Sequence, residues 1–385
     1  MTIRNIIYIV ENPPDQRDFE RFGINYLLEQ KEEIKIWDIS FIKRGDIFDT
    51  FYQVEKKEGK IIRKFKEEQE LVEAIQKLGS KDVVVIVLPY SSLRKEIWDA
   101  LSFSKAYYGL LNNGGLCPME YFHWNLIRLL RLVRHVKKFL KNRVKTKGKI
   151  FLPFVLTGTR HTLPKDAPIN IRKTDIIYSH NFDYDIYLKN INKKPVLQYK
   201  YILFLDCFLP HHPDYNILKR EKPVEPEEYY PHLNLFFQKV EKHFGFPVVI
   251  AAHPRSYYEK MENPFEGRLI LRKETAVLVR DSEFVLSQMS FSSNFANIYH
   301  KSVIFVDIGS IRNRERRQIG VQASWFGKSP LDIGKKNKTI NWLKELKISE
   351  RHYREYKEKY IKTAHSLEKN TWVIFHEFLK NLRWS

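Results

Sequence analysis

Short apolar runs alternate with amphipathic stretches along most of the chain. In the first half, runs rich in Ile, Val and Leu predict buried strands at 4–10, 34–40, 82–88, 150–156 and 175–179. Helices are predicted at 18–32 and 67–78, and residues 45–65 suit a hairpin or a loop. Strands separated by helices are typical of a parallel sheet with helices on its faces.

The second half begins the same pattern again. Strands are predicted at 201–205, 248–252, 268–271, 284–287 and 303–307, helices at 231–244, 275–280 and 294–300, and one long charged helix at 350–383. The fold class is therefore α/β, with two Rossmann-like domains facing a cleft. A polar stretch at 192–200 contains Pro195 and predicts the boundary. The expected domains are 1–195 on the acceptor side, 196–345 on the donor side, and a helical segment, 346–385.

Composition favours a globular protein of the reducing cytoplasm. The chain has 385 residues, of which 43% are hydrophobic and 29% charged. No apolar run reaches the ~18 residues that span a bilayer, and the N-terminal run is expected to be a strand rather than a signal peptide. The two cysteines, Cys117 and Cys207, are far apart, which disfavours a disulfide framework.

A net charge of +20 leaves three partner classes open, namely nucleic acid, an anionic membrane and anionic substrates. No nucleic-acid module is evident, and a solvated lysine-rich surface explains the charge equally well. A predicted helix at 119–147 has an apolar stripe and a basic face, as do helices that lie on anionic membranes. It suits equally a domain helix with its stripe in the core. Arginines 312, 314, 316 and 317 form a second basic cluster.

Two short motifs follow predicted strands and suggest a phosphate site. His253-Pro254 comes after the strand at 248–252, where the histidine can protonate or hydrogen-bond a phosphate, and Arg255 adds charge. Serines 290, 292 and 293 precede a predicted helix and supply hydroxyl donors. Thr275, which starts the preceding helix, is a candidate for the sugar or base of a nucleotide. The alternatives are a histidine that caps a strand and a serine that caps a helix.

Candidate bases and acceptor-side residues come from the first half and the domain boundary. Asp183 and Asp185 are two apart, so in an extended segment they share a face. Asp206 follows a predicted strand, and His180 is a companion candidate. The glycine-bearing loop at 110–116 suits an acceptor side, and its candidates are Asn112, Asn113, Gly114 and Gly115. Each of these segments also suits an ordinary turn.

Metal and cofactor binding are not expected. His211, His212 and Asp214 are bunched in a proline-bearing loop, and no second cluster completes a metal site.

The His-Pro and Ser-Ser pairs, in this order and spacing, resemble motifs of bacterial sialyltransferases and related CMP-sugar transferases of the GT-B type. The resemblance covers about 199–307 and implies a CMP-activated donor, no bound metal, and a C-terminal helix that crosses back to the first domain. Those sialyltransferases also carry an acidic D/E-D/E-G triplet that supplies the base, and the triplet is absent here. CDP-glycerol phosphotransferases place a histidine and a Ser-Ser pair in a similar fold.

The function expected from the sequence is glycosyl transfer. The donor is a CMP-activated acidic sugar of the nonulosonate or Kdo type, and the acceptor is a surface glycan or its lipid-linked precursor. The alternatives are a CDP-glycerol-type phosphotransferase, a GT-B enzyme that uses a UDP-sugar, and a non-catalytic basic protein that binds membrane or nucleic acid. The expected location is cytoplasmic, peripheral on the inner face of the membrane.

Overall fold

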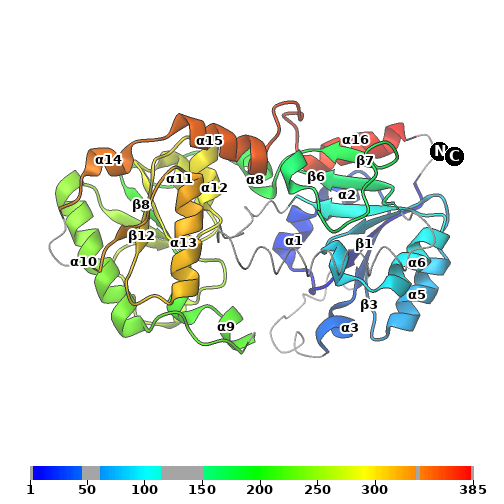
Figure 1. The fold of residues 1–385 in the computed structure, drawn as a ribbon, viewed down its shortest axis with the longest axis horizontal. Coiled ribbons are helices and arrows are strands. Elements are labelled where there is room, and N and C mark those ends of the chain that lie inside the picture. The colour runs from blue at the N-terminus through cyan, green and yellow to red at the C-terminus, as the bar shows by residue number, and fades with distance from the viewer. Residues whose placement is uncertain (1–2, 46–60, 114–150, 218, 335–338, 383–385) are drawn as a thin grey trace, which may run out of the picture. The chain divides into compact units, whose positions relative to one another are not determined.

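The computed structural model describes residues 3–45, 61–113, 151–217, 219–334 and 339–382. The described residues form two compact units (Figure 1). The first contains residues up to Phe182 and again from Lys362 onward, and the second contains Asp183–Ile361. Gly114, Gly115, Cys117 and the predicted helix at 119–147 lie outside the described residues.

The first unit is built on a seven-stranded sheet in which every pairing is parallel. The strand order is β3-β2-β1-β4-β5-β6-β7. The strands are β1 (Asn5–Val10), β2 (Ile34–Asp38), β3 (Ile62–Lys64), β4 (Asp82–Ile86), β5 (Tyr107–Asn112), β6 (Phe154–Thr157) and β7 (Asp175–Tyr178). The helices are α1 (Gln16–Arg21), α2 (Ile24–Glu29), α3 (Ser40–Arg44), α5 (Glu68–Gln76), α6 (Lys95–Phe103) and α16 (Thr371–Asn381).

The central strands of this sheet are buried on both faces. Alternate residues of β1 enter two separate hydrophobic clusters, with Ile7 and Ile9 in one and Ile6 and Tyr8 in the other. This is why the strand reads as a nearly continuous apolar run rather than as an alternating one.

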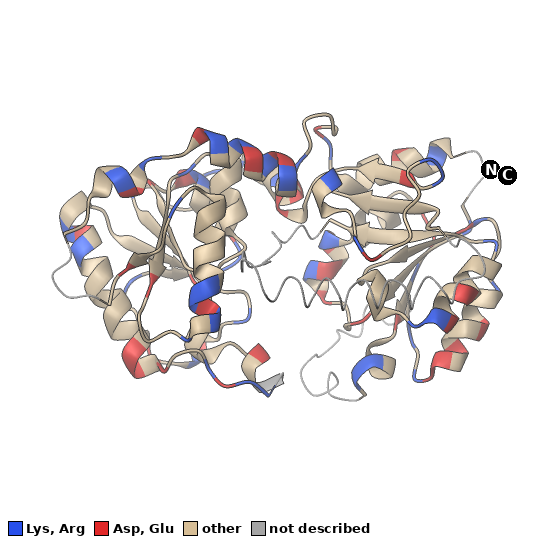
Figure 2. Cartoon of the chain, viewed as in Figure 1, with Lys and Arg blue, Asp and Glu red and all other residues tan. Residues whose placement is uncertain are grey.

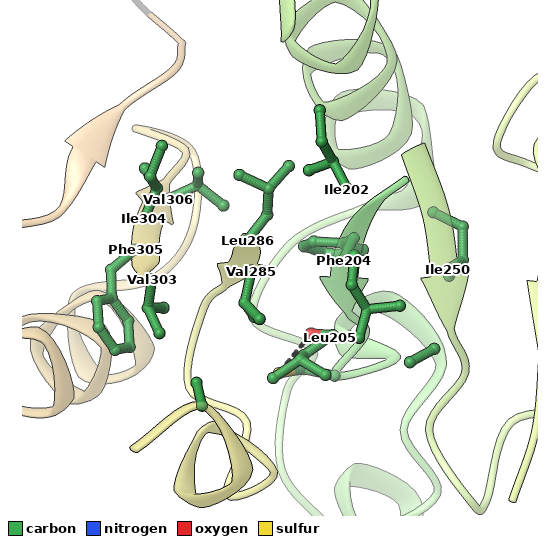
Figure 3. Packing of buried hydrophobic residues seen from close by; sticks show 14 of the residues in the cluster. Ile202, Phe204, Leu205, Ile250, Val285, Leu286, Val303, Ile304, Phe305 and Val306 are labelled. Carbon is green, nitrogen blue, oxygen red and sulfur yellow. Dashed lines mark hydrogen bonds between the residues drawn. The ribbon is translucent and has the colours of Figure 1, made fainter. Parts of the chain in front are cut away.

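The second unit has a six-stranded sheet, again parallel throughout, in the order β10-β9-β8-β11-β12-β13. The strands are β8 (Ile202–Leu205), β9 (Val248–Ala251), β10 (Ile270–Leu271), β11 (Val285–Ser287), β12 (Val303–Asp307) and β13 (Leu331–Asp332). Its helices are α8 (Phe182–Asn190), α9 (Asp214–Ile217), α10 (Pro226–Phe244), α11 (Thr275–Asp281), α12 (Ser293–Ile298), α13 (Asn313–Trp325), α14 (Trp342–Leu346) and α15 (Glu350–Tyr356). Figure 3 shows the aliphatic and aromatic side chains that pack along β8, β11 and β12.

Both sheets have the Rossmann order, in which the first strand lies at the centre and the order reverses beside it. The α/β class with two Rossmann-like units, expected from the sequence, is therefore confirmed. The C-terminal return is confirmed as well, because α16 belongs to the first unit. The Trp372 indole N–H donates to the Arg21 carbonyl at 3.0 Å, and His376 Nε2 lies 2.8 Å from Glu32 Oε1.

Several elements differ from expectation. The helix expected at 18–32 is two helices, because Gly23 between them has a φ of 63°. The single helix expected at 350–383 is wrong, since α15 runs into a π-helical turn (Lys357–Ile361) and a non-helical connection precedes α16. The loop expected at 110–116 is also wrong in its first part, because Leu110–Asn112 end β5, a strand that the pattern missed. β13 and α13 were missed too.

Charged residues of both signs lie on the helices and loops, and the strands carry few of them (Figure 2). The arginine cluster at 312–317 begins α13. In this cluster, Arg312 forms an ion pair with Glu221, and Arg316 forms one with Asp307 at the end of β12. Among the described residues, no helix is long and apolar enough to cross a membrane. Cys207 is buried as a free thiol.

Gly23 provides a test of how tightly α16 packs on the first unit. A Cβ at Gly23 would overlap the indole ring of Trp372, whereas a Cβ at Gly245, which has a similar left-handed backbone, would meet open space. We expect Gly245→Ala to cost about 1–2 kcal/mol from backbone strain alone. Gly23→Ala should cost a further ~1–3 kcal/mol from overpacking. Urea unfolding followed by circular dichroism measures both, and equal costs would contradict the close packing.

Candidate functional site

The strand ends of the second unit meet at one edge of its sheet. Leu205 of β8 pairs with Ala251 of β9 on one side and with Ser287 of β11 on the other. All three strands are parallel, so the residues that follow them emerge at the same edge, and at the usual spacing β9 and β11 lie about 10 Å apart. The strand order reverses between β8 and β11, which is where such sheets bind ligands.

Asp206 is the first residue beyond β8 and is only 2% exposed. One carboxylate oxygen accepts a hydrogen bond from the Phe208 amide at 2.8 Å. The other accepts from the His253 amide at 3.3 Å and from the Tyr258 hydroxyl at 3.0 Å. Asp206 thus ties the loop after β8 to the loop after β9. With both oxygens engaged, it is better suited to positioning His253 than to deprotonating an acceptor.

His253 follows β9, and its ring is held by its own turn. The ring Nδ1 accepts a hydrogen bond from the Arg255 backbone amide at 3.2 Å. Because a backbone amide can only donate, the neutral ring carries its proton on Nε2. Pro254 and Arg255 are exposed, and the Arg255 guanidinium lies 2.6 Å from a carboxylate oxygen of Asp214. Residues from the loops after β8 and β9 are therefore brought together here.

The three serines of the second motif differ in their surroundings. Ser293 is fully buried, and its hydroxyl lies 2.9 Å from that of Ser287. Ser292 is the N-cap residue of α12 but makes no side-chain cap hydrogen bond. The Ser290 carbonyl accepts from Gln322 at 2.7 Å. Ser290 and Ser292 are both partly exposed, and the Ser292 hydroxyl, which does not cap the helix, is suited to meet a ligand.

Asp183 and Asp185 lie in the first turn of α8, so the expected extended segment is wrong. Two positions along a helix are about 200° apart, and the two carboxylates therefore cannot share a face. Asp183 accepts a hydrogen bond from the Asn294 side chain at 2.6 Å, and the Asn294 oxygen accepts from Tyr356 at 2.6 Å. Asn294 follows Ser293 directly, so Asp183 is brought next to the serine motif.

The other sequence candidates lie elsewhere. Thr275 begins α11 after the edge strand β10, two strands away from β8. His180 is buried in the first unit, where its Nε2 lies 2.8 Å from the Lys369 carbonyl, and Asn113 donates to Ser179 at 2.8 Å. Asn112 donates to the Thr162 carbonyl. These contacts hold the C-terminal segment and neighbouring loops in place, which favours structural roles.

Sequence reasoning missed three residues around this edge, namely Tyr258, Asn294 and Tyr356. Tyr258 donates to Asp206, Asn294 donates to Asp183, and Tyr356 donates to the Asn294 oxygen. These contacts join segments far apart in the sequence, so the sequence pattern did not mark them. His212 was considered only as a metal-ligand look-alike. The His212 ring lies 4.7 Å from the His253 ring. The feature that could have identified His212 from the sequence is that it begins a second His-Pro pair, at 212–213. Within the described ranges, no three His, Cys, Asp or Glu side chains are grouped as metal ligands.

No protein-family model and no curated protein sequence matches the chain. Several solved structures are similar to it in fold. The UDP-GlcNAc 2-epimerase of Methanocaldococcus jannaschii is 12% identical over 98% of this chain and 100% of that chain, with a TM-score of 0.48. MurG of Acinetobacter baumannii is 10% identical over 98% and 99%, with a TM-score of 0.44.

The wall teichoic acid polymerase TagF, in a structure soaked with CDPG, is 10% identical over 99% of this chain and 89% of that chain, with a TM-score of 0.46. At such low identities the likeness concerns the fold alone, and at these TM-scores none of the three assigns a substrate.

Asp206 predicts an unusual dependence of stability on pH. Burial raises its pKa from the ordinary 3.8 to about 6, against the opposing effect of the hydrogen bonds from Phe208, His253 and Tyr258. Between pH ~4 and ~6, the Asp206 carboxyl therefore stays protonated in the folded protein but is ionised in the unfolded chain. The contribution of Asp206 to the free energy of unfolding should be greatest below pH ~4, fall by about 3 kcal/mol as the pH rises through ~6, and level off above pH ~7.

Urea unfolding of wild type and Asp206→Asn across this pH range isolates the contribution, because the asparagine variant lacks the titration. Carboxyl ¹³C NMR of the folded protein reads the pKa directly. A midpoint near 4 would contradict the effect of burial.

Proposed function

We propose that the protein is a glycosyltransferase that moves an acidic sugar of the nonulosonate or Kdo type from a CMP-activated donor to a surface glycan or its lipid-linked precursor. The observation that carries this proposal is the setting of His253. Its ring follows β9 at the carboxyl edge of a Rossmann-ordered sheet, is held in the tautomer that presents Nε2–H, and shares that edge with the serine motif after β11.

His253 would act on the leaving nucleotide. In transfer, the bond between the sugar carbon and the phosphate oxygen breaks, and the electron pair leaves with the phosphate. A neutral imidazole that donates from Nε2 stabilises the charge that develops on this oxygen. Arg255 and Ser292 would supply a positive charge and a hydroxyl to the same group. The same residues suit a phosphate of any nucleotide donor, so the choice of CMP rests on the motif resemblance.

The acceptor hydroxyl must lose a proton as it forms the new bond to the sugar carbon. We propose Asp183 as the group that takes it. Asp183 is half-buried beside Asn294, next to the serine motif, whereas Asp206 is only 2% exposed. The proposed location is peripheral to the inner face of an anionic membrane, on the strength of the basic helix predicted from sequence at 119–147.

Nucleotide binding tests the proposal first. A thermal-shift series with CMP, CDP, UDP and GDP should show the largest stabilisation by CMP, since a ligand that binds only the folded state raises the melting temperature. Preference for CDP would point to a CDP-glycerol-type phosphotransferase and preference for UDP to a UDP-sugar enzyme. No stabilisation by any of the four would sink the enzymatic proposal in favour of a binding protein.

His253→Asn should lower turnover of the CMP-sugar about 10²-fold or more, because removal of one donor to a developing oxyanion has this effect. Asparagine places its oxygen near the position of Nδ1 and so preserves the turn to Arg255. Full activity in this variant would reduce His253 to a structural residue.

Asp183 and Asp185 form a matched pair for testing the base. Asp183→Asn should abolish transfer with little change in melting temperature or CMP affinity. Asp185→Asn, on another side of the same helical turn, should retain activity. Measurement of kcat over a pH range for both variants checks this, and the opposite pattern would move the proposed base from Asp183 to Asp185.

A further inference from the structure

The His-Pro pair of the donor site occurs a second time in the chain. His212-Pro213-Asp214 lies in the loop after β8, beyond a short 3-10 turn (Leu209–His211), and His253-Pro254-Arg255 begins the loop after β9. The two segments also have the same local geometry. The His212 Nδ1 accepts from the Asp214 amide at 3.2 Å, and the His253 Nδ1 accepts from the Arg255 amide at 3.2 Å. In each, the intervening proline has no N–H, so the amide two residues on is the one that reaches the ring.

The two turns lie against each other. The imidazole rings of His212 and His253 are 4.7 Å apart and meet edge to face at 66°. The third residues of the turns also pair, since the Arg255 guanidinium lies 2.6 Å from Asp214 Oδ1. Asp206 joins the starts of the same two loops through the amides of Phe208 and His253. The Arg255–Asp214 ion pair and the hydrogen bonds to Asp206 thus fix the position of the two rings relative to each other.

This arrangement determines what the rings offer to a ligand. In both, Nδ1 is occupied by an amide that can only donate, so the neutral ring carries its proton on Nε2. A nitrogen that carries a proton cannot coordinate a metal, but it can donate to an anion. Burial lowers the pKa of His212, with Arg255 acting in the same direction and Asp214 opposing, which favours the neutral ring.

We propose that His212 is a second phosphate-binding residue and that its Nε2–H, together with that of His253, donates to the phosphate oxygens of the nucleotide. The proposal rests on the nucleotide-dependent function above and adds a ligand contact from β8, the strand at which the sheet order reverses. Two donors on adjacent loops can bind two oxygens of one phosphate.

The chain offers a matched set of substitutions at His212. Asparagine places an oxygen where Nδ1 was and can still accept from the Asp214 amide, but it loses the Nε2 donor. Glutamine places an N–H near the Nε2 position and keeps a donor. CMP affinity, measured by calorimetry, should therefore fall about tenfold or more in His212→Asn and clearly less in His212→Gln. His211→Gln, in the neighbouring ring that packs on Phe208 and Tyr230, is the control and should leave CMP affinity unchanged.

Cytidine separates the phosphate contact from contacts to the base and ribose. His212→Asn should not change cytidine affinity, and inorganic phosphate should compete with CMP less strongly in this variant than in wild type. Long-range ¹H–¹⁵N NMR of the imidazoles gives a readout that does not depend on affinity. Both rings should show the Nε2–H tautomer, and both signals should shift with CMP but not with cytidine.

The outcomes distinguish this inference from the proposal on which it rests. If wild type binds CMP and His253→Asn weakens binding but His212→Asn does not, the second donor is refuted and the proposed function stands. Equal weakening of CMP and cytidine by His212→Asn would also refute it, because the effect would not come from the phosphate. If wild type binds none of CMP, CDP, UDP and GDP, both the proposed function and the role of His212 as a phosphate donor are refuted.

Discussion

The candidate site depends on one buried carboxylate. Asp206 is almost fully removed from water, and burial alone would favour its neutral form. Three donors from the loops after β8 and β9 offset part of that cost. Asp206 fixes the geometry of the site in return. The loops that follow parallel strands are not held by the sheet itself, and Asp206, which accepts hydrogen bonds from the loop after β8 and the loop after β9, holds these two loops together. His212, His253, Asp214 and Arg255 all emerge from the two loops that Asp206 joins.

The strands and their parallel arrangement were largely predictable, because strands buried on both faces form short apolar runs. The failures have physical causes. Tyr107–Asn112 forms β5 although Tyr-Tyr-Gly opens it, because Gly109 lets the backbone approach Phe154 of β6 more closely than a side chain would allow. At Gly23, where the helix breaks, the space that a Cβ would fill is taken by Trp372, which lies far away in the sequence. No local pattern contains that information.

The candidate site was also predictable only in part from the sequence. His253 and the serines were marked by their position after apolar runs, and the structure joins Ser293 to Ser287 and His253 to Asp206. The extended segment expected around Asp183 and Asp185 was wrong, because these residues lie in the first turn of α8, where Asp183 meets Asn294. Side chains that act through a second residue, such as Tyr356 acting through Asn294, depend on tertiary contacts alone. The repeated His-Pro pair was visible in the sequence, but its meaning required the distance between the two rings.

The return of the chain to its first unit has a consequence for synthesis on the ribosome. Trp372, Phe375 and Leu379 of α16 belong to a hydrophobic cluster that also contains Ile6, Tyr8 and Val83. That core is incomplete until α16 has been translated, whereas every described strand of the second unit has by then been made. The second unit can therefore fold first, and the N-terminal sheet must wait with one face uncovered. A nascent chain stalled before residue 371 would expose this apolar face, which makes it the part of the molecule most in need of a chaperone during translation.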